Sequence, residues 1–355
     1  MGFNFSSNHQ QPNISVSTPE PTTSGHDEED ILSVGVIGSL IFTLILAVII
    51  FFGNGLVILL VVRFERLRTV TNYLMMSLAA ADAIVSVSMV FGVVFILTPK
   101  SFENKYTCLG MWNTFMFAGF TSCLSLLLVT FERYLKISRP FSYQHIATTR
   151  VTFIAIAVIW IYTILLTIVL PLAGNNIVQS GSEFDCLDFN QVFHSAYLQF
   201  LLYANAILPF TIMCFIYCKL FLLVLEKLRS STATADVSSK HWLKIEFKSV
   251  KTLLILLGFT GLAWLPISFM VLTDIYLGDS WTPSVELRSL FCMLLYINST
   301  ANPIIYSLRS EQFRTASIKL FCGDHRYRRW QPPVIPLSTI GGGTSKSPIT
   351  AMSTV

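Results

Sequence analysis

The chain has 355 residues, of which 53% are hydrophobic and 12% charged, and its formal net charge is +4. A typical soluble domain is about 25% charged, so this composition excludes an ordinary water-soluble globular protein and favours a membrane protein. No glycine-rich phosphate loop, zinc-ligand spacing or Ser/His/Asp arrangement is evident in the sequence, so we expect that the chain is not an enzyme.

The first 33 residues are polar, contain no Lys or Arg, and include an acidic run at 27–30. Such a segment cannot bury enough apolar area to fold alone, so we expect 1–33 to be disordered. No charged region followed by a short apolar stretch opens the chain, so no cleaved signal peptide is predicted. Asn4 and Asn13 each begin an acceptor sequon and are candidate glycosylation sites.

Seven apolar segments follow, and each is near or above the ~20 residues that cross a bilayer as a helix. Backbone groups in lipid must be satisfied within the segment, so helices are expected throughout. The segment limits are about 34–62, 71–97, 108–136, 150–173, 195–226, 245–273 and 284–307. The sequence therefore predicts an all-α membrane protein whose seven-helix bundle occupies residues 34–307.

Basic residues indicate the orientation of this bundle. With the N-terminus outside, the outer connections contain only Lys100, Lys105 and Arg288 of the 24 Lys and Arg residues. The rest then lie inside, as the positive-inside rule requires. We therefore expect a multi-pass protein of the plasma membrane with an extracellular N-terminus. The basic residues around the third inner loop fit contact with the anionic inner leaflet as well as with a protein partner.

An amphipathic eighth helix is predicted at 308–322, with Phe313 and Phe321 facing lipid and Arg314 facing water. Cys322 at its end is a candidate palmitoylation site. Residues 323–355 are rich in Pro, Gly, Ser and Thr, so we expect them to be disordered.

Charged residues inside the spans indicate functional positions. Glu132 and Arg133 stand together where the third span meets polar sequence, and Asp82 is a carboxylate deep in the second span. Each of these charges also has a non-functional interpretation. Glu132 and Arg133 would then only extend their charged groups to the membrane interface. Asp82 would be protonated and take part in a structural hydrogen-bond network.

Landmark residues appear one set per span, in a fixed order. They are Gly53-Asn54, Leu78-Ala79-Ala80-Ala81-Asp82, Glu132-Arg133-Tyr134, Trp160, Pro209 with Tyr217, Trp264-Leu265-Pro266, and Asn302-Pro303-Ile304-Ile305-Tyr306. With these landmarks the chain resembles the rhodopsin-like (class A) G-protein-coupled receptors from about residue 34 to residue 322.

The resemblance implies three internal sites. A sodium ion is expected at Asp82 with Ser122, Asn298 and Asn302, as an allosteric ion and not a required cofactor. A disulfide is expected between Cys108 and Cys186, with two free thiols as the alternative. An activation switch is expected from the following residues: Glu132, Arg133, Tyr134, Tyr217, Glu246, Trp264, Pro266, Pro303 and Tyr306.

The resemblance also implies a ligand pocket, whose candidate residues are mostly apolar. They are Phe115, Met116, Gly119, Trp264, Met270, Asp274, Cys292 and Tyr296. This set fits a lipid-like or small apolar ligand, a peptide, or no diffusible agonist. Phe115 stands where amine receptors have Asp, and Tyr296 where opsins have the retinal Lys, so neither of these subfamilies is predicted.

Another departure concerns the sixth helix, where Thr260 replaces the usual Phe of the transmission layer and its partner in the third helix is Cys123. We hypothesise that this softer layer alters basal activity.

Expected partners are an extracellular ligand, membrane lipids and a heterotrimeric G protein, which would contact Arg133, Pro140 and Phe141. Phosphorylation of the Ser/Thr-rich tail would favour arrestin. The terminus Ser353-Thr354-Val355 has the form that PDZ domains bind. No nucleic-acid partner is expected. A transporter is the alternative of a different class, although the internal repeats typical of transporters are not found. A receptor-like scaffold without signalling is the second alternative.

Overall fold

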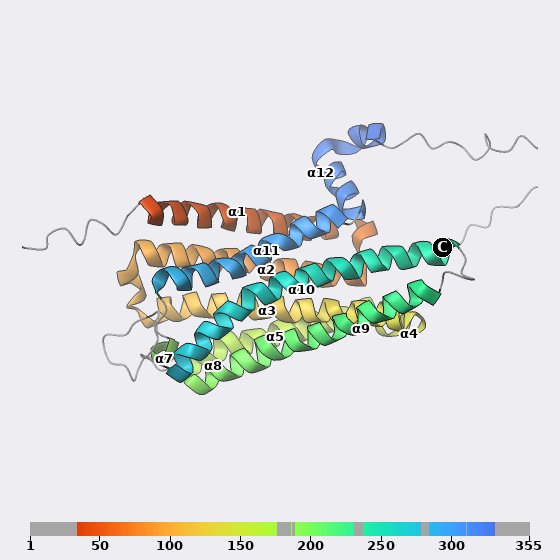
Figure 1. Ribbon diagram of the computed structural model, residues 1–355. Helices are drawn as coiled ribbons and strands as arrows, with labels where there is room; N and C mark the ends of the chain where they lie inside the picture. Colours follow the sequence, from red (N-terminus) through yellow and green to blue (C-terminus); the bar gives the residue numbers. More distant parts are fainter. Residues whose placement is uncertain are drawn as a thin grey trace, which may run out of the picture. The chain divides into compact units, whose positions relative to one another are not determined.

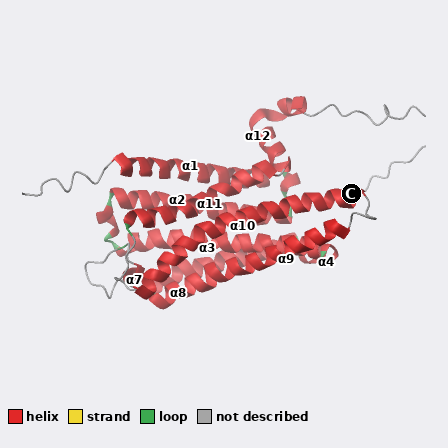
Figure 2. Cartoon of the chain, viewed as in Figure 1, coloured by secondary structure: helices red, strands yellow, loops and turns green. Residues whose placement is uncertain are grey.

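The computed structural model describes residues 34–175, 186, 189–230, 237–277, 284–309 and 311–330. For some residues inside these ranges it describes the backbone and not the side chain. The chain divides into two compact units, 1–42 and 43–355. Within the described residues all regular elements are helices (Figures 1 and 2), which confirms the all-α prediction.

The elements that cover the predicted spans agree with the sequence limits to within four residues, except that α10 begins eight residues before its predicted start at 245. They are α1 (Val34–Arg63), α2 (Val70–Leu97), α3 (Lys105–Ser138), α5 (Thr149–Ile164) with η4 (Leu165–Val169) and α6 (Leu170–Ala173), α8 (Ser195–Leu202) with η5 (Tyr203–Ile207) and α9 (Leu208–Ser230), α10 (Val237–Leu277) and α11 (Val285–Arg309). Six of these are long and apolar enough to cross a membrane, and α11 contributes the shorter apolar stretch Leu290–Ile304.

Shorter elements join the spans. They are η2 (Glu65–Leu67), η3 (Pro99–Phe102), α4 (Pro140–Ile146) and α7 (Phe189–Val192), and α12 (Glu311–Trp330) follows α11. Helix starts carry side-chain caps: Thr69 accepts from the backbone N–H of Asn72, and Asn104 from that of Tyr106. In Figure 1, α12 turns away from the direction of α11.

The final helix, α12, was predicted to end at 322 but continues to Trp330. The expectation of disorder from 323 onward rested on Pro- and Gly-rich composition. The first prolines in this part of the chain, however, are Pro332 and Pro333. Proline disfavours helical backbone at the residue before it, so a helix end close to this pair is physically reasonable.

Two spans contain a π-helical turn that the sequence analysis did not predict. In both cases a proline lies two residues past the turn: Pro171 after η4 and Pro209 after η5. Because proline cannot donate to the carbonyl four residues earlier and its ring clashes there, the preceding turn widens.

Two tyrosines join the two spans that contain these π-helical turns. We call these spans columns: one consists of α5, η4 and α6, and the other of α8, η5 and α9. The Tyr162 hydroxyl of α5 donates to Asn205 Oδ1 in η5 at 2.8 Å. The Tyr197 hydroxyl of α8 donates to the Leu166 carbonyl in η4 at 3.0 Å. Each π-helical turn is thus contacted by a tyrosine from the other column.

Two large groups of buried side chains form the core of the bundle. The inner group gathers around Leu78, Leu126 and Tyr217, and the outer group surrounds Cys108 and Met116, with Trp264 packed against both. The half-buried landmark Trp160 donates its indole N–H to Ser77 Oγ at 3.0 Å, joining α5 to α2. These contacts hold residues that are distant in sequence together, in one group near the inner side of the bundle and another near the outer side.

Candidate functional site

Asp82 of α2 is fully buried at the centre of a polar network. Its Oδ1 accepts from the hydroxyls of Ser122 and Ser299, each at 2.9 Å, and its Oδ2 accepts from Asn302 Nδ2. The network thus joins α2, α3 and α11.

The predicted ion-site residues do not all contact Asp82. Ser122 and Asn302 do, whereas Asn298 Oδ1 accepts from the Thr260 hydroxyl of α10 at 3.2 Å. Ser299 was missed, although it precedes Asn302 by one helical turn and therefore shares its face. That spacing was the signal available in the sequence.

The chemistry of this network fits a hard cation. Oxygen atoms from a carboxylate, two hydroxyls and an amide converge here, and the buried Asn302 Oδ1 has no hydrogen-bond partner. A buried amide oxygen without a donor carries a desolvation cost that a cation or a water would relieve. The described residues contain no cluster of three His, Cys, Asp or Glu side chains that would suit a different metal.

A second polar cluster surrounds Glu132 at the inner end of α3. Glu132 Oε2 lies 3.5 Å from Arg133 Nε. Glu132 Oε1 accepts from the Thr71 hydroxyl of α2 at 2.7 Å and from the Tyr143 hydroxyl of α4 at 2.6 Å. We call Glu132, Arg133, Thr71 and Tyr143 the inner cluster.

Tyr143 acts as a donor in the inner cluster. Partial burial, and then its hydrogen bond to the charged Glu132, raise the pKa of Tyr143 above the ordinary value for tyrosine. The hydroxyl therefore keeps its proton at neutral pH and stabilises the carboxylate. Neither Thr71 nor Tyr143 was singled out from the sequence, because both contacts depend on tertiary packing.

Other predicted switch residues lie around this cluster. Tyr217 is buried and lies 3.2 Å from the Thr130 hydroxyl, while Tyr134 packs against the inner core group. Pro140 begins α4, and Phe141 beside it is 89% exposed. The side chains of Glu246 and Tyr306 are outside the described residues, so their predicted contacts are not placed.

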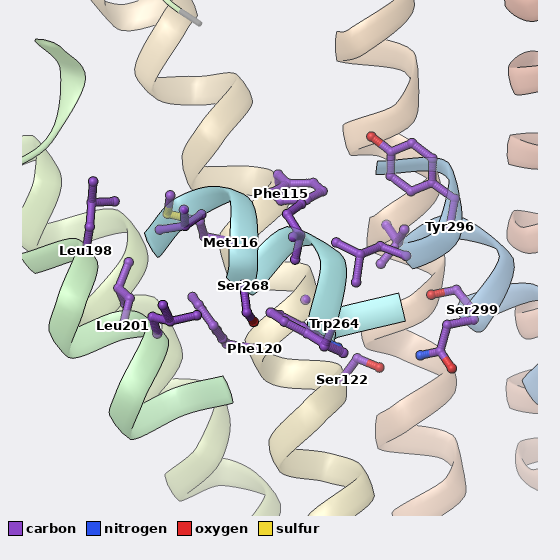
Figure 3. A pocket seen from close by; sticks show the side chains of 17 residues that line it. Phe115, Met116, Phe120, Ser122, Leu198, Leu201, Trp264, Ser268, Tyr296 and Ser299 are labelled. Carbon is purple, nitrogen blue, oxygen red and sulfur yellow. The ribbon is translucent and has the colours of Figure 1, made fainter. Parts of the chain in front are cut away.

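A cavity of about 80 Å³ lies between α3, α8, α10 and α11 (Figure 3). Apolar side chains dominate its lining. In the view of Figure 3, Phe115 and Tyr296 lie toward the upper end, while Ser122 of the Asp82 network lies at the lower end. Drug-sized ligands occupy pockets of roughly 300–1,000 Å³, so such a ligand requires the surrounding helices to move apart.

Five of the eight predicted pocket residues line the cavity: Phe115, Met116, Gly119, Trp264 and Tyr296. The other three do not. Met270 is buried in the outer core group, and Cys292 packs against the same group. Asp274 instead lies at the outer end of α10, with its Oδ1 3.5 Å from Arg288 Nη2 of α11.

Trp264 lies where the resemblance placed it, on the wall of the cavity. Its ring stacks on Phe120 with 5.5 Å between centroids. A Cβ atom at Gly119 would come within 3.3 Å of the indole, so glycine permits this close approach. Pro266 and Pro303 stand inside α10 and α11, as expected from their spans.

The predicted disulfide between Cys108 and Cys186 is present and buried. The Cys186 carbonyl also accepts from the Trp112 indole N–H at 2.8 Å. Cys322 is exposed on α12, next to the exposed Phe321. The candidate sequons at Asn4 and Asn13 and the terminus Ser353-Thr354-Val355 are outside the described residues.

Comparison with known proteins adds independent findings. The pattern of the family described as "7 transmembrane receptor (rhodopsin family)" matches residues 53–306. The chain is 28% identical to adenosine receptor A3 of Canis lupus familiaris over 275 residues, which cover 76% of this chain and 86% of that receptor. It is 29% identical to adenosine receptor A3 of Ovis aries over 267 residues, covering 74% and 82% respectively.

The family match spans more than half of the chain and confirms the predicted family, receptor activity and plasma-membrane location, in place of the transporter alternative. The chain belongs to the rhodopsin family of seven-transmembrane receptors and is a G-protein-coupled receptor of the plasma membrane.

Proposed function

We propose that this receptor responds to an apolar extracellular ligand. Binding of the ligand moves α10, and this movement opens the inner end of the bundle to a heterotrimeric G protein. The chain itself carries out no chemistry, since nucleotide exchange takes place on the partner. The observation that carries this proposal is the inner cluster, in which Glu132 is bound by groups from α2, α3 and α4.

Arg133 is the residue whose release defines the active form. In the resting arrangement its guanidinium lies beside Glu132, 3.5 Å away. Once separated from this carboxylate, a guanidinium with five donors is able to bind the backbone carbonyls of an inserted partner helix. The exposed Phe141 lies in α4, which also contains Tyr143 of the inner cluster, and offers an apolar contact to the same partner.

The chemistry of the cavity supports the choice of an apolar ligand. Adenosine, the ligand that the relatives' names give, presents many hydrogen-bonding groups. Among mainly hydrocarbon surfaces, the cavity offers it the hydroxyls and one amide of the following residues: Ser122, Ser268, Tyr296, Asn298 and Ser299. Polar ligand groups left without partners would lose about 1–3 kcal/mol each, so this lining favours a less polar molecule.

Asp82, Ser122, Ser299 and Asn302 are the residues proposed to hold sodium, with the unpartnered Asn302 Oδ1 in support. A bound cation would neutralise the buried carboxylate. The Asp82 carboxylate oxygens also hold α2, α3 and α11 together through their hydrogen bonds to Ser122, Ser299 and Asn302.

Peripheral sites complete the proposal. The exposed Phe321 and Cys322 support lipid anchoring of α12, with palmitate on the cysteine. Glycosylation at Asn4 and Asn13, arrestin binding to the phosphorylated tail and PDZ binding at Ser353-Thr354-Val355 rest on sequence alone.

Ligand-free signalling tests the proposal. We would measure cAMP, calcium and G-protein dissociation in cells that express the chain, with Arg133→Ala as the comparison at equal surface expression. We expect the basal signal to fall to the background of untransfected cells in Arg133→Ala, and adenosine to leave the wild-type signal unchanged. A wild-type receptor at the cell surface with no signal above this background would support the scaffold alternative, and an Arg133→Ala receptor that signals above background like the wild type would contradict the role of Arg133.

A further inference from the structure

Thr260 is buried in α10 at the level just below Trp264, and its side chain reaches the neighbouring helix. It is 1% exposed, and its hydroxyl donates to Asn298 Oδ1 of α11 at 3.2 Å. Among the described residues, several buried threonine hydroxyls bond within their own helix, as Thr273 does with the Met270 carbonyl. The Thr260 contact instead crosses between α10 and α11.

Asn298 connects this contact to both functional regions of the bundle. It lines the cavity together with Trp264. Its neighbour Ser299 donates to Asp82 Oδ1 at 2.9 Å. The Thr260 hydroxyl therefore links α10 to Asn298 of α11, one residue away from the Asp82 network.

The residue that follows Thr260 is packed closely by an aromatic ring of α9. Phe210 of α9 places its ring against the backbone of the next residue, Gly261, where a Cβ atom would approach Phe210 Cζ to 2.6 Å. Only glycine leaves room for this ring. α10 therefore packs against α9 at Gly261 and bonds to α11 at Thr260.

We propose that Thr260 is a positioning residue whose hydroxyl holds α10 to α11 in the resting receptor, so that α10 must break this bond to move. The proposal rests on the movement of α10 proposed above. It replaces the expectation of a softer layer with a specific polar restraint. Loss of one buried hydrogen bond changes an equilibrium by about fivefold, and we expect basal signalling to rise by that factor when the hydroxyl is removed.

The test uses Thr260→Val, which keeps the shape and removes the hydroxyl, and Thr260→Ser, which keeps the hydroxyl. The matched control is Thr273→Val on the same helix, because buried Thr273 donates to the Met270 carbonyl of its own helix at 2.8 Å. G-protein dissociation without ligand is measured per receptor at the cell surface, together with the thermal stability of the purified receptors.

We expect Thr260→Val to raise the basal signal about fivefold, while Thr260→Ser and Thr273→Val stay near the wild type. In an Asn298→Ala background, Thr260→Val should add nothing further, because the acceptor is already gone. A purely structural role would lower stability in both valine variants without raising the signal per receptor. That result, or a serine variant as active as the valine variant, overturns the proposal.

Glu132→Gln separates this proposal from the proposed function. If Glu132→Gln raises the signal and Thr260→Val does not, the Thr260 restraint is wrong and the receptor mechanism stands. If neither variant raises the signal and Arg133→Ala does not lower it, the proposed function itself is wrong.

Discussion

The two ends of the bundle each contain a carboxylate beside an arginine, yet the two pairs are built differently. At the inner end, Glu132 receives hydroxyl hydrogen bonds of 2.6 and 2.7 Å from α4 and α2 in addition to its contact with Arg133. At the outer end, Asp274 and Arg288 join α10 to α11 across 3.5 Å. The inner carboxylate therefore ties together elements that are far apart in sequence, whereas the outer pair joins consecutive helices.

This difference predicts which contact stabilises the resting state and which contact breaks when a ligand binds. A carboxylate with short bonds from several elements is costly to separate, since hydrogen bonds to charged groups contribute about 1.5–3 kcal/mol each. The outer contact joins Asp274 to Arg288, whose side chain is 21% exposed, so water partly screens this pair and it contributes less. We therefore expect the inner cluster to set the resting state and the outer pair to yield when a ligand enters.

The largest effect is expected from Glu132→Gln, which keeps the side-chain shape and removes the charge that the inner cluster shares. Loss of charge-assisted bonds worth about 1.5–3 kcal/mol should raise ligand-free G-protein dissociation about tenfold or more. The control is Glu65→Gln, because Glu65 is also an inner glutamate paired with an arginine, Arg68 at 3.8 Å, but is 86% exposed. Equal signals from the two variants would refute a special role for the inner cluster.

A smaller effect is expected from Tyr143→Phe, which removes one hydroxyl from the inner cluster and leaves Thr71 as a donor. Ligand-free signalling should rise about threefold, in keeping with the loss of one of several hydrogen bonds. Tyr106→Phe is the control, since this tyrosine is 68% exposed at the outer end of α3. A Tyr143→Phe receptor with wild-type basal signalling would show that α4 does not restrain the resting state.

The smallest effect on basal signalling is expected at the outer pair. Asp274→Asn, Arg288→Gln and the double variant should stay within about twofold of the wild type without ligand. The thermal stabilities of the three variants should give a coupling energy of about 1 kcal/mol in a double-mutant cycle. A basal rise as large as that of Glu132→Gln would erase the contrast between the two ends.

The sequence predicted the spans and their order well, because apolar length and basic-residue asymmetry are properties of the chain itself. It also identified Asp82, Glu132 and Arg133, since charges at membrane depth stand out in any sequence. It did not predict Ser299, Thr71 or Tyr143 as partners, because hydroxyl residues are common and only tertiary packing selects among them.

Asp274 shows the opposite difficulty. A carboxylate near the outer end of a span was interpreted as a pocket residue, but its ion pair with Arg288 accounts for its position. The sequence placed these two residues on separate predicted elements without indicating that they face each other. The π-helical turns were likewise not predicted, since proline in a span indicates a distortion without specifying its form.

The reciprocal contacts of Tyr162 and Tyr197 have a consequence for how the bundle divides into stationary and moving parts. Two hydrogen bonds in opposite directions resist both sliding and rotation of one column past the other. We therefore expect α5 to hold α8 in place, so that α8 forms a fixed wall of the cavity. A ligand that presses on Leu198 and Leu201 from inside meets this wall and pushes against α10 instead. We therefore expect the helices held by these two bonds to determine the direction in which α10 moves.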